Sequence, residues 1–261
     1  MNGVNKTLYI PLYGKAFVSQ KGLFLDDKKA EEIWDAEGFK LRGKAKSKWL
    51  AYYMGIRSAV FDSWLKEKMS RMPEANVIHI GCGMDSRVLR VDREGHMWYD
   101  IDFPEVIAER RRYYDESENY KMVAENATDC DFKQVIPRGD SAIVVMEGVS
   151  MYLSPAQLQG LVSKLSARFG KIALLMDCYS EFAARMSKYK NPINEVGVTE
   201  VYGLDEPMSL ESGDFKFIKK HDMTPESYID QLKGLENKIF RKLYAGNFAR
   251  KLYKLYEYAR V

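Results

Sequence analysis

Cysteine and histidine are scarce in this sequence, and long hydrophobic runs are missing from it. Only three cysteines and three histidines occur among 261 residues. The cysteines lie far apart without any CxxC spacing, so they predict neither a disulfide framework nor a structural zinc site. No run approaches the roughly 18 apolar residues of a membrane-spanning helix, and the N-terminus has no apolar signal segment. We therefore expect a cytoplasmic protein that binds no metal and no membrane.

An excess of charge of one sign is also missing. The chain has 40 basic and 37 acidic residues, which gives a formal net charge of +3. So small an excess offers a polyanion little attraction, and we expect no nucleic-acid partner. With 46% hydrophobic residues the chain can bury one large core. We expect a single domain in which an N-terminal layer, residues 1–72, precedes a core of residues 73–261.

These two regions differ in their hydrophobic patterns. Between Asp26 and Met72 apolar side chains recur every three or four residues, as expected for helices. After Pro73 short apolar runs alternate with helical segments, which is typical of a parallel sheet with crossover helices. Seven of these runs are predicted strands, and the last two are expected to form an antiparallel unit. The pattern therefore predicts an α/β fold with a seven-stranded, mostly parallel sheet.

The segment of residues 179–213 fits neither pattern. A connection of this length within a compact domain often builds part of a binding site. Its aromatic residues, among them Tyr179 and Tyr202, favour a lid over a substrate. A packed excursion without a functional role is the alternative interpretation.

A glycine loop follows the first predicted strand. The stretch VIHIGCGMDSR, residues 77–87, places Gly81 and Gly83 where a parallel sheet exposes backbone amides to a ligand. A dinucleotide site would need a third glycine, where this chain has Ser86, and the anionic Asp85 beside it disfavours a phosphate. An ammonium or sulfonium group suits Asp85 better. A nicotinamide-dependent oxidoreductase is therefore the less favoured alternative.

The ends of the next three strands add groups that suit a nucleoside. Asp102 lies 19 residues beyond Gly83, about where an acidic residue accepts hydrogen bonds from ribose hydroxyls. Capping of the helix that begins at Pro104 is the other interpretation of Asp102. The segment AENATD after the third strand suits an adenine edge, and Glu147 ends the fourth strand. Together the four strand ends favour a positively charged nucleoside, S-adenosylmethionine.

Six segments occur in a fixed order along the chain: GKAFVSQKGLFLDD, GIRSAVFDSWL, IHIGCGMDSR, WYDIDFPEVI, AENATD and MEGVSMYL. With this set the chain resembles the leucine carboxyl methyltransferase family, which includes bacterial polyketide O-methyltransferases. The resemblance covers most of the chain. It implies a Rossmann-like class I methyltransferase fold with an added N-terminal helical layer, S-adenosylmethionine as cofactor and S-adenosylhomocysteine (SAH) as product.

The resemblance also implies roles for residues near the methionine part of the cofactor. Lys15 and Arg57 match the basic residues that approach the methionine carboxylate. Gly81, Cys82 and Gly83 match the loop under the cofactor.

Four further residues match positions around the rest of the cofactor. Asp102 matches the ribose carboxylate, and Glu147 matches the acidic residue near the amino end. Asn126 and Ala127 occupy the adenine-side positions, where the family usually has an aspartate followed by a leucine. This chain therefore keeps a polar partner there but lacks one charge and some apolar cover.

The expected reaction is an in-line displacement, in which a carboxylate or hydroxyl oxygen of a small molecule, or of a carboxyl terminus, takes the methyl group. Because the methyl group is already activated, the protein mainly aligns the acceptor and excludes water. A hydroxyl acceptor would need a base, and Tyr152, Tyr202 and His221 are the candidates, with Tyr152 and Tyr202 also the candidate acceptor-pocket residues. A non-catalytic module that binds S-adenosylmethionine is the alternative function.

Overall fold

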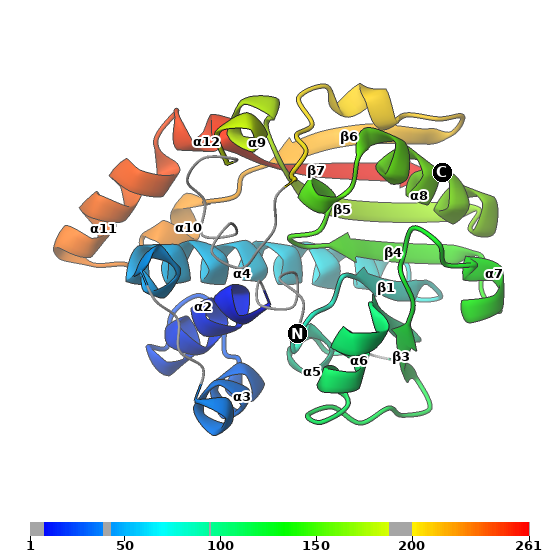
Figure 1. The fold of residues 1–261 in the computed structure, drawn as a ribbon, viewed down its shortest axis with the longest axis horizontal. Helices are drawn as coiled ribbons and strands as arrows, with labels where there is room; N and C mark the ends of the chain where they lie inside the picture. The colour runs from blue at the N-terminus through cyan, green and yellow to red at the C-terminus, as the bar shows by residue number, and fades with distance from the viewer. Residues whose placement is uncertain (1–7, 39–42, 94, 188–199, 261) are drawn as a thin grey trace.

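A seven-stranded sheet forms the centre of the computed structural model, which describes residues 8–38, 43–93, 95–187 and 200–260 (Figure 1). The strand order is β3-β2-β1-β4-β5-β7-β6, with β7 antiparallel to both of its neighbours and the other pairs parallel. The predicted seven strands and the antiparallel last pair are therefore confirmed. The strands are β1 (Asn76–Ile80), β2 (Trp98–Asp102), β3 (Tyr120–Ala124), β4 (Ser141–Met146), β5 (Lys171–Tyr179), β6 (Phe215–His221) and β7 (Tyr253–Arg260).

Helices cover both faces of the sheet. In Figure 1 the long helix α4 (Lys48–Arg71) runs behind the sheet and α8 (Pro155–Arg168) lies in front of it. Successive residues of a strand point to opposite faces: Val77 packs in the cluster that contains α4, and Ile78 in the cluster that contains α8. The shorter helices of the core are α5 (Arg87–Arg90), α6 (Pro104–Arg110), α7 (Phe132–Val135), η2 (Ser150–Tyr152), α9 (Glu181–Ser187) and η4 (Pro207–Leu210).

Local sequence explains where several helices begin and end. The hydroxyl of Ser154 accepts a hydrogen bond from the Gln157 amide and Gln157 returns one, so α8 begins with the expected capping box. Asp27 caps α3 (Lys28–Glu37) through the Ala30 amide. Gly38 ends α3 in the left-handed conformation that glycine adopts without strain.

The N-terminal layer contains one helix that the hydrophobic pattern did not predict. Helix α2 (Tyr9–Gln20) precedes the expected helical region and packs on α4, where Gly14 and Gly55 leave room for close contact. Residues of α2 and α4 share one hydrophobic cluster with β1. A short helix, η1 (Gly43–Lys46), joins α3 to α4.

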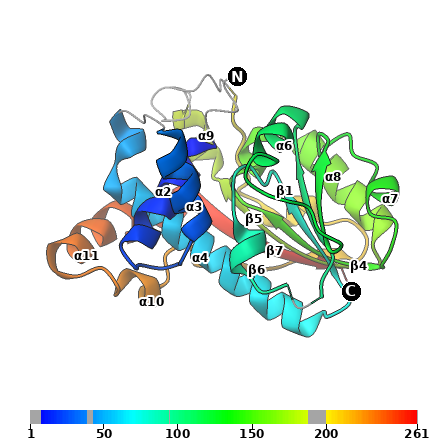
Figure 2. The same cartoon turned by 90° about the horizontal axis from the view of Figure 1, so that it is seen from below.

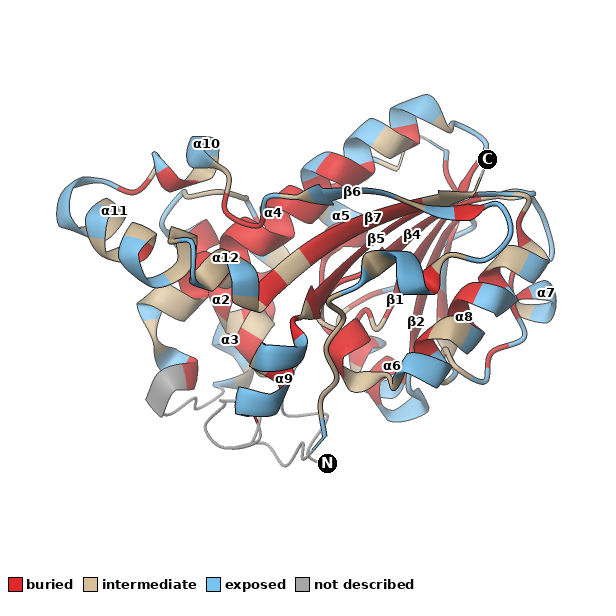
Figure 3. Cartoon of the chain, turned by 90° about the horizontal axis from the view of Figure 1, so that it is seen from above, coloured by how far each residue is buried: buried red, intermediate tan, exposed pale blue. Residues whose placement is uncertain are grey.

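A helical insertion joins β6 to β7. It consists of α10 (Glu226–Ile229), α11 (Gly234–Phe240), the π-helix η5 (Arg241–Ala245) and α12 (Ala249–Leu252). Seen from below, the insertion lies on the same side as α2, α3 and the start of α4 (Figure 2). The Tyr228 hydroxyl donates to the carbonyl of Ala59, which joins the insertion to α4. Figure 3 shows that the strands are buried, whereas α10 and α11 expose much of their surface.

The strand order places the binding crevice. The chain runs from β1 outward to β2 and β3 and then returns to β4 on the other side of β1. Ligands of open α/β sheets bind at the carboxyl ends of the strands beside such a reversal. The loops after β1 and β4 therefore meet at the position where a ligand is expected. None of the helices in the described part of the chain combines the length and the hydropathy that crossing a membrane requires.

Candidate cofactor and acceptor site

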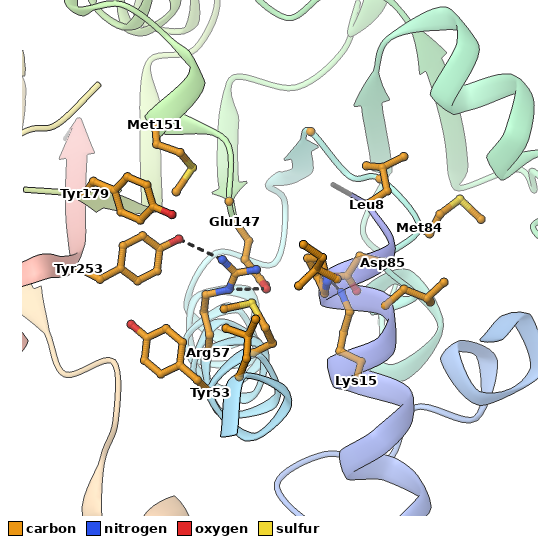
Figure 4. A pocket seen from close by; sticks show the side chains of 18 of the residues that line it. Leu8, Lys15, Tyr53, Arg57, Met84, Asp85, Glu147, Met151, Tyr179 and Tyr253 are labelled. Carbon is orange, nitrogen blue, oxygen red and sulfur yellow. Dashed lines mark hydrogen bonds and ion pairs between the residues drawn. The ribbon is translucent and has the colours of Figure 1, made fainter. Parts of the chain in front are cut away.

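A cavity of about 320 Å³ opens at the carboxyl ends of β1 and β4, between the N-terminal helices and the insertion before β7 (Figure 4). This volume lies within the range of small-molecule sites. Its walls come from α2, α4, the loops after β1 and β4, β5, the insertion and β7. Six of the nine predicted cofactor residues line it: Lys15, Arg57, Gly81, Cys82, Gly83 and Glu147.

The glycine loop has a conformation that other residues rarely adopt. Gly81 and Gly83 have φ angles of 66° and 51°, in the left-handed region that glycine enters without a steric penalty. A Cβ atom on Gly81 would lie 2.2 Å from the Val149 side chain. The loop after β1 thus touches the loop after β4, and only a glycine fits between them.

Glu147 is the centre of a buried ion-pair network. Its carboxylate accepts from Nε of Arg57 at 3.0 Å and also from Nη2 of Arg87, which is completely buried. Burial alone would raise the pKa of Glu147, but the charges of Arg57, Arg87 and Lys15 outweigh it and lower the pKa to about 2. Glu147 is therefore ionised at neutral pH.

Asp85 attracts an ammonium group, as its charge predicted, but that ammonium belongs to Lys15. The two side chains lie 2.8 Å apart, and Nη1 of Arg90 lies 2.7 Å from the same carboxylate. Burial would raise the pKa of Asp85, yet Arg87, Arg90 and Lys15 together hold it well below its usual range. The network thus ties α2 to the glycine loop.

Asp102 lies behind the glycine loop and does not line the cavity. Its carboxylate accepts from the amides of Gly83 and Phe103, each at 2.8 Å. Burial raises the pKa of Asp102, and the two amide hydrogen bonds offset part of that increase. The acidic side chain therefore orients the loop that the cofactor is expected to cover.

The predicted adenine-side residues follow β3 and also lie outside the cavity lining. The Asn126 side chain accepts from the amide and hydroxyl of Thr128 and donates to Asp129 at 2.9 Å. Ala127 is partly buried against the cluster that contains α8. Asn126 therefore stabilises a turn after β3 in the absence of ligand.

The structure separates the two candidate acceptor residues. Tyr152 lines the large cavity, whereas Tyr202 lines a second cavity of about 130 Å³ beside η4. His221 is on β6, where Nε2 lies 2.5 Å from the Glu257 carboxylate. Residues 188–199 of the expected lid lie outside the described residues, and Tyr179 is its member that lines the large cavity.

The sequence interpretation missed a wall of four tyrosines in this cavity: Tyr53, Tyr179, Tyr244 and Tyr253, here called the tyrosine wall. The rings of Tyr53 and Tyr244 stack at 4.9 Å, and Tyr253 lies 6.1 Å from Tyr53 and 5.1 Å from Tyr179. These residues come from α4, β5, η5 and β7, so no local spacing marks them as a group.

Asp177 was missed as well, although its position carried a signal. It follows five apolar residues near the end of β5, much as Glu147 follows β4. It is fully buried beneath the tyrosine wall, and Tyr253 and Nη1 of Arg57 both donate to its carboxylate.

Solved structures with the same fold are methyltransferases. Magnesium protoporphyrin IX methyltransferase from Synechocystis PCC 6803, with bound SAH, superposes with a TM-score of 0.52 at 12% identity, covering 95% of this chain and all of that one. The plantazolicin methyltransferase BamL superposes with a TM-score of 0.52 at 10% identity, covering 98% of this chain and 97% of that one. The fold is thus that of the class I S-adenosylmethionine-dependent methyltransferases.

Sequence comparison then gives the family. The model of the leucine carboxyl methyltransferase family matches residues 5–166. The tetracenomycin polyketide synthesis O-methyltransferase TcmP of Streptomyces glaucescens is 30% identical over 217 residues, which cover 81% of this chain and 79% of that protein. The S-adenosyl-L-methionine-dependent methyltransferase dpfgK of Gibberella zeae is 23% identical over 237 residues, with the same coverage. The chain belongs to the leucine carboxyl methyltransferase family.

This membership confirms the predicted enzyme class and cofactor. The protein is an S-adenosylmethionine-dependent methyltransferase, and the nicotinamide-dependent alternative is set aside. No group of metal-ligating side chains occurs within the described ranges.

Proposed function

We propose that this enzyme transfers the methyl group of S-adenosylmethionine to a hydroxyl or carboxylate oxygen of a small molecule bound against the tyrosine wall. One observation carries the proposal: a single cavity joins the glycine loop and its charged neighbours to the tyrosine wall. Direct methyl transfer needs donor and acceptor in one such unbroken space. The name of the relative TcmP, an O-methyltransferase, supports an oxygen acceptor.

The charged residues of the cavity fit the methionine part of the cofactor. Nε and Nη1 of Arg57 bond to carboxylates, and Nη2 forms no hydrogen bond to the described residues, so it is available to the methionine carboxylate. Lys15 stands on the opposite side of the cavity with N–H groups beyond the one directed at Asp85. The ionised Glu147 suits the cationic amino group.

The loop and the strand ends fit the nucleoside part. Gly81 and Gly83 leave space that a Cβ atom would fill, so the backbone can approach a ligand closely. We assign the ribose hydroxyls to the free lone pairs of Asp102, and the adenine edge to Asn126 and Ala127.

The sulfonium supplies an activated methyl group, so the chain's own residues mainly position and enclose the reactants. Apolar side chains from the N-terminal layer and from η2, including Leu8, Met54 and Met151, line the cavity and exclude water from it. Tyr152 lies on this same lining and is assigned to the acceptor side.

Four further features belong to the proposal. Residues 1–72 and 73–261 form one domain, which the hydrophobic cluster shared by α2, α4 and β1 supports. Residues 179–213 act as a lid. The small net charge supports an acceptor other than nucleic acid. The three scattered cysteines support a reducing, cytoplasmic setting.

Calorimetric titration with S-adenosylmethionine and SAH tests the proposal. Both ligands are expected to bind the wild-type protein, and Asp102→Ala is expected to weaken binding by about tenfold or more, because it removes a charged hydrogen-bond acceptor. Asp131→Ala is the matched control, since this exposed carboxylate also accepts a backbone N–H, that of Lys133. Failure of the wild-type protein to bind either ligand would refute the proposal.

A further inference from the structure

The hydroxyl of Tyr253 has two fixed partners at the edge of the cavity. It donates its proton to Oδ2 of Asp177, and it accepts from Nη1 of Arg57 at 3.0 Å. Arg57 also donates to the same Asp177 oxygen at 3.1 Å. The Gly148 amide fixes the other oxygen of Asp177 at 2.7 Å. Figure 4 shows the hydroxyls of Tyr179 and Tyr253 pointing toward Arg57 and Glu147.

These bonds decide what kind of ligand Tyr253 can recognise. A phenol oxygen has one proton and two acceptor positions. Asp177 takes the proton and Arg57 fills one acceptor position, so the remaining position can only receive a proton from a ligand. A hydroxyl group has such a proton. An ionised carboxylate has none, and its oxygen would face the lone pair of Tyr253.

The charges that line the cavity point to the same ligand. The charged lining residues of the described chain are Lys15, Arg57, Asp85 and Glu147, and each already forms an ion pair with an opposite charge. The remaining donor of Arg57 is the one assigned above to the cofactor. A carboxylate bound at the tyrosine wall would therefore be a buried anion without a cation of its own, which is costly.

The shape of the acceptor half suits a flat ring. Tyr53 and Tyr244 present stacked rings, and Tyr253 and Tyr179 continue the wall. Aromatic faces favour offset or edge-to-face contact with another aromatic ring. Leu243, Ala249 and Leu252 of the insertion add apolar surface around the wall.

We infer that the acceptor is a neutral aromatic hydroxyl compound, and that Tyr253 and Asp177 receive its proton. This inference rests on the proposed function and narrows its acceptor. The acceptor proton passes to the Tyr253 oxygen while the Tyr253 proton passes to Asp177. The acceptor oxygen bonds to the methyl carbon as the carbon–sulfur bond breaks, and its electron pair remains on sulfur. The negative charge of Asp177 and the positive charge of the sulfonium disappear together, so charge balances.

The titration behaviour of the two groups agrees with these roles. Burial raises the pKa of Asp177 above its usual range, although Arg57 and the hydrogen bond from Tyr253 oppose that increase. Burial also raises the pKa of Tyr253 well above its usual range, with a further increase from Asp177. The phenol thus stays protonated between turnovers, and the carboxylate is the proton acceptor of the pair.

Ligand preference in the SAH complex tests the inference without requiring turnover. Calorimetry with 2-naphthol and with 2-naphthoate is expected to give about tenfold or tighter binding of the naphthol, because only it can donate to Tyr253. Tyr253→Phe should abolish that preference. Tyr258→Phe on the same strand should keep it, since that hydroxyl donates instead to the carbonyl of Pro207. Equal or tighter binding of 2-naphthoate by the wild-type protein, or binding of neither compound, overturns the inference.

Product analysis gives a second readout. With 3-hydroxy-2-naphthoate the enzyme is expected to form the methyl ether, which withstands mild alkali, rather than the methyl ester. Asp177→Asn should lower kcat at least tenfold while the affinity for SAH stays within about threefold of wild type. Formation of the ester, or no methylation of the hydroxyl by a protein that binds 2-naphthol, overturns the inference. If the wild-type protein does not bind SAH, the proposed function itself fails; if SAH binds without the naphthol preference, only this inference fails. Thermal unfolding confirms that each variant is folded.

Discussion

The ammonium of Lys15 lies 2.8 Å from the carboxylate of Asp85, and both side chains are almost completely buried. Lys15 belongs to α2 and Asp85 to the loop after β1, so this ion pair joins the N-terminal layer to the glycine loop. Arg90 and Arg87 hold the other sides of the same carboxylate. The added helices therefore form part of the cofactor site itself.

Lys15→Met is expected to lower both stability and cofactor affinity. The loss of one of three cations around a buried carboxylate should reduce the free energy of unfolding by about 1–3 kcal/mol. Urea denaturation measures this change, and calorimetry with SAH measures the loss of affinity. Lys28→Met removes an exposed partner of Glu31 and should change neither quantity noticeably. A Lys15→Met protein with wild-type stability would contradict the structural role.

Two glycine-to-alanine substitutions should act in opposite directions. Gly81→Ala forces a positive φ on alanine and places a methyl group against Val149, so it should destabilise the protein by about 1–3 kcal/mol and weaken SAH binding. Gly160 lies inside α8 with open space around it. Gly160→Ala should stabilise the protein by about 0.5–1 kcal/mol, because alanine loses less entropy in a helix. Thermal unfolding of both variants checks the pair, and equal effects would refute the assignment.

Acid should weaken the link between β7 and its neighbours. Burial would raise the pKa of Glu257, but hydrogen bonds from His221 and Lys68 outweigh it and lower the pKa to about 2. A carboxyl whose pKa is lowered in the folded protein stabilises it above the pKa of the unfolded chain, and this contribution disappears as pH falls from about 4.5 toward 2.

The measurement for Glu257 is the free energy of unfolding of the wild-type protein and Glu257→Gln as a function of pH. The variant should be less stable by on the order of 2–3 kcal/mol at pH 7, and the difference should shrink steadily below about pH 4.5. A difference that stays constant down to pH 3 would show that the ionised form of Glu257 is not what stabilises the fold.

Tyr152 and Tyr202 should respond differently to loss of their hydroxyls. Tyr152 lines the large cavity and Tyr202 the smaller one. Tyr152→Phe is expected to weaken binding of 2-naphthol to the SAH complex by about threefold to tenfold, whereas Tyr202→Phe should leave it unchanged. An effect confined to Tyr202→Phe would assign the acceptor to the smaller cavity.

Much of the core could be predicted because its signals are local. Apolar runs mark the strands, since a parallel sheet is buried on both faces, and the capping box marks the start of α8. Helix α2 escaped prediction because part of its surface contacts α4 rather than solvent, which weakens the amphipathic pattern. The short helices of the insertion have too few turns to show a period.

The sequence by itself determined the sheet, the glycine loop and the polar residues at the strand ends, because each depends on neighbours within a few positions. Only the tertiary structure decided what those residues contact. It paired Lys15 with Asp85, surrounded Glu147 with two arginines, and brought Asp177 beneath Tyr253. These partners are separated by 70 to 76 residues or lie on strands that pair only after the chain has reversed direction. Ion pairs and aromatic stacking act over a few ångströms, so their partners are fixed by packing and leave no periodic trace in the sequence.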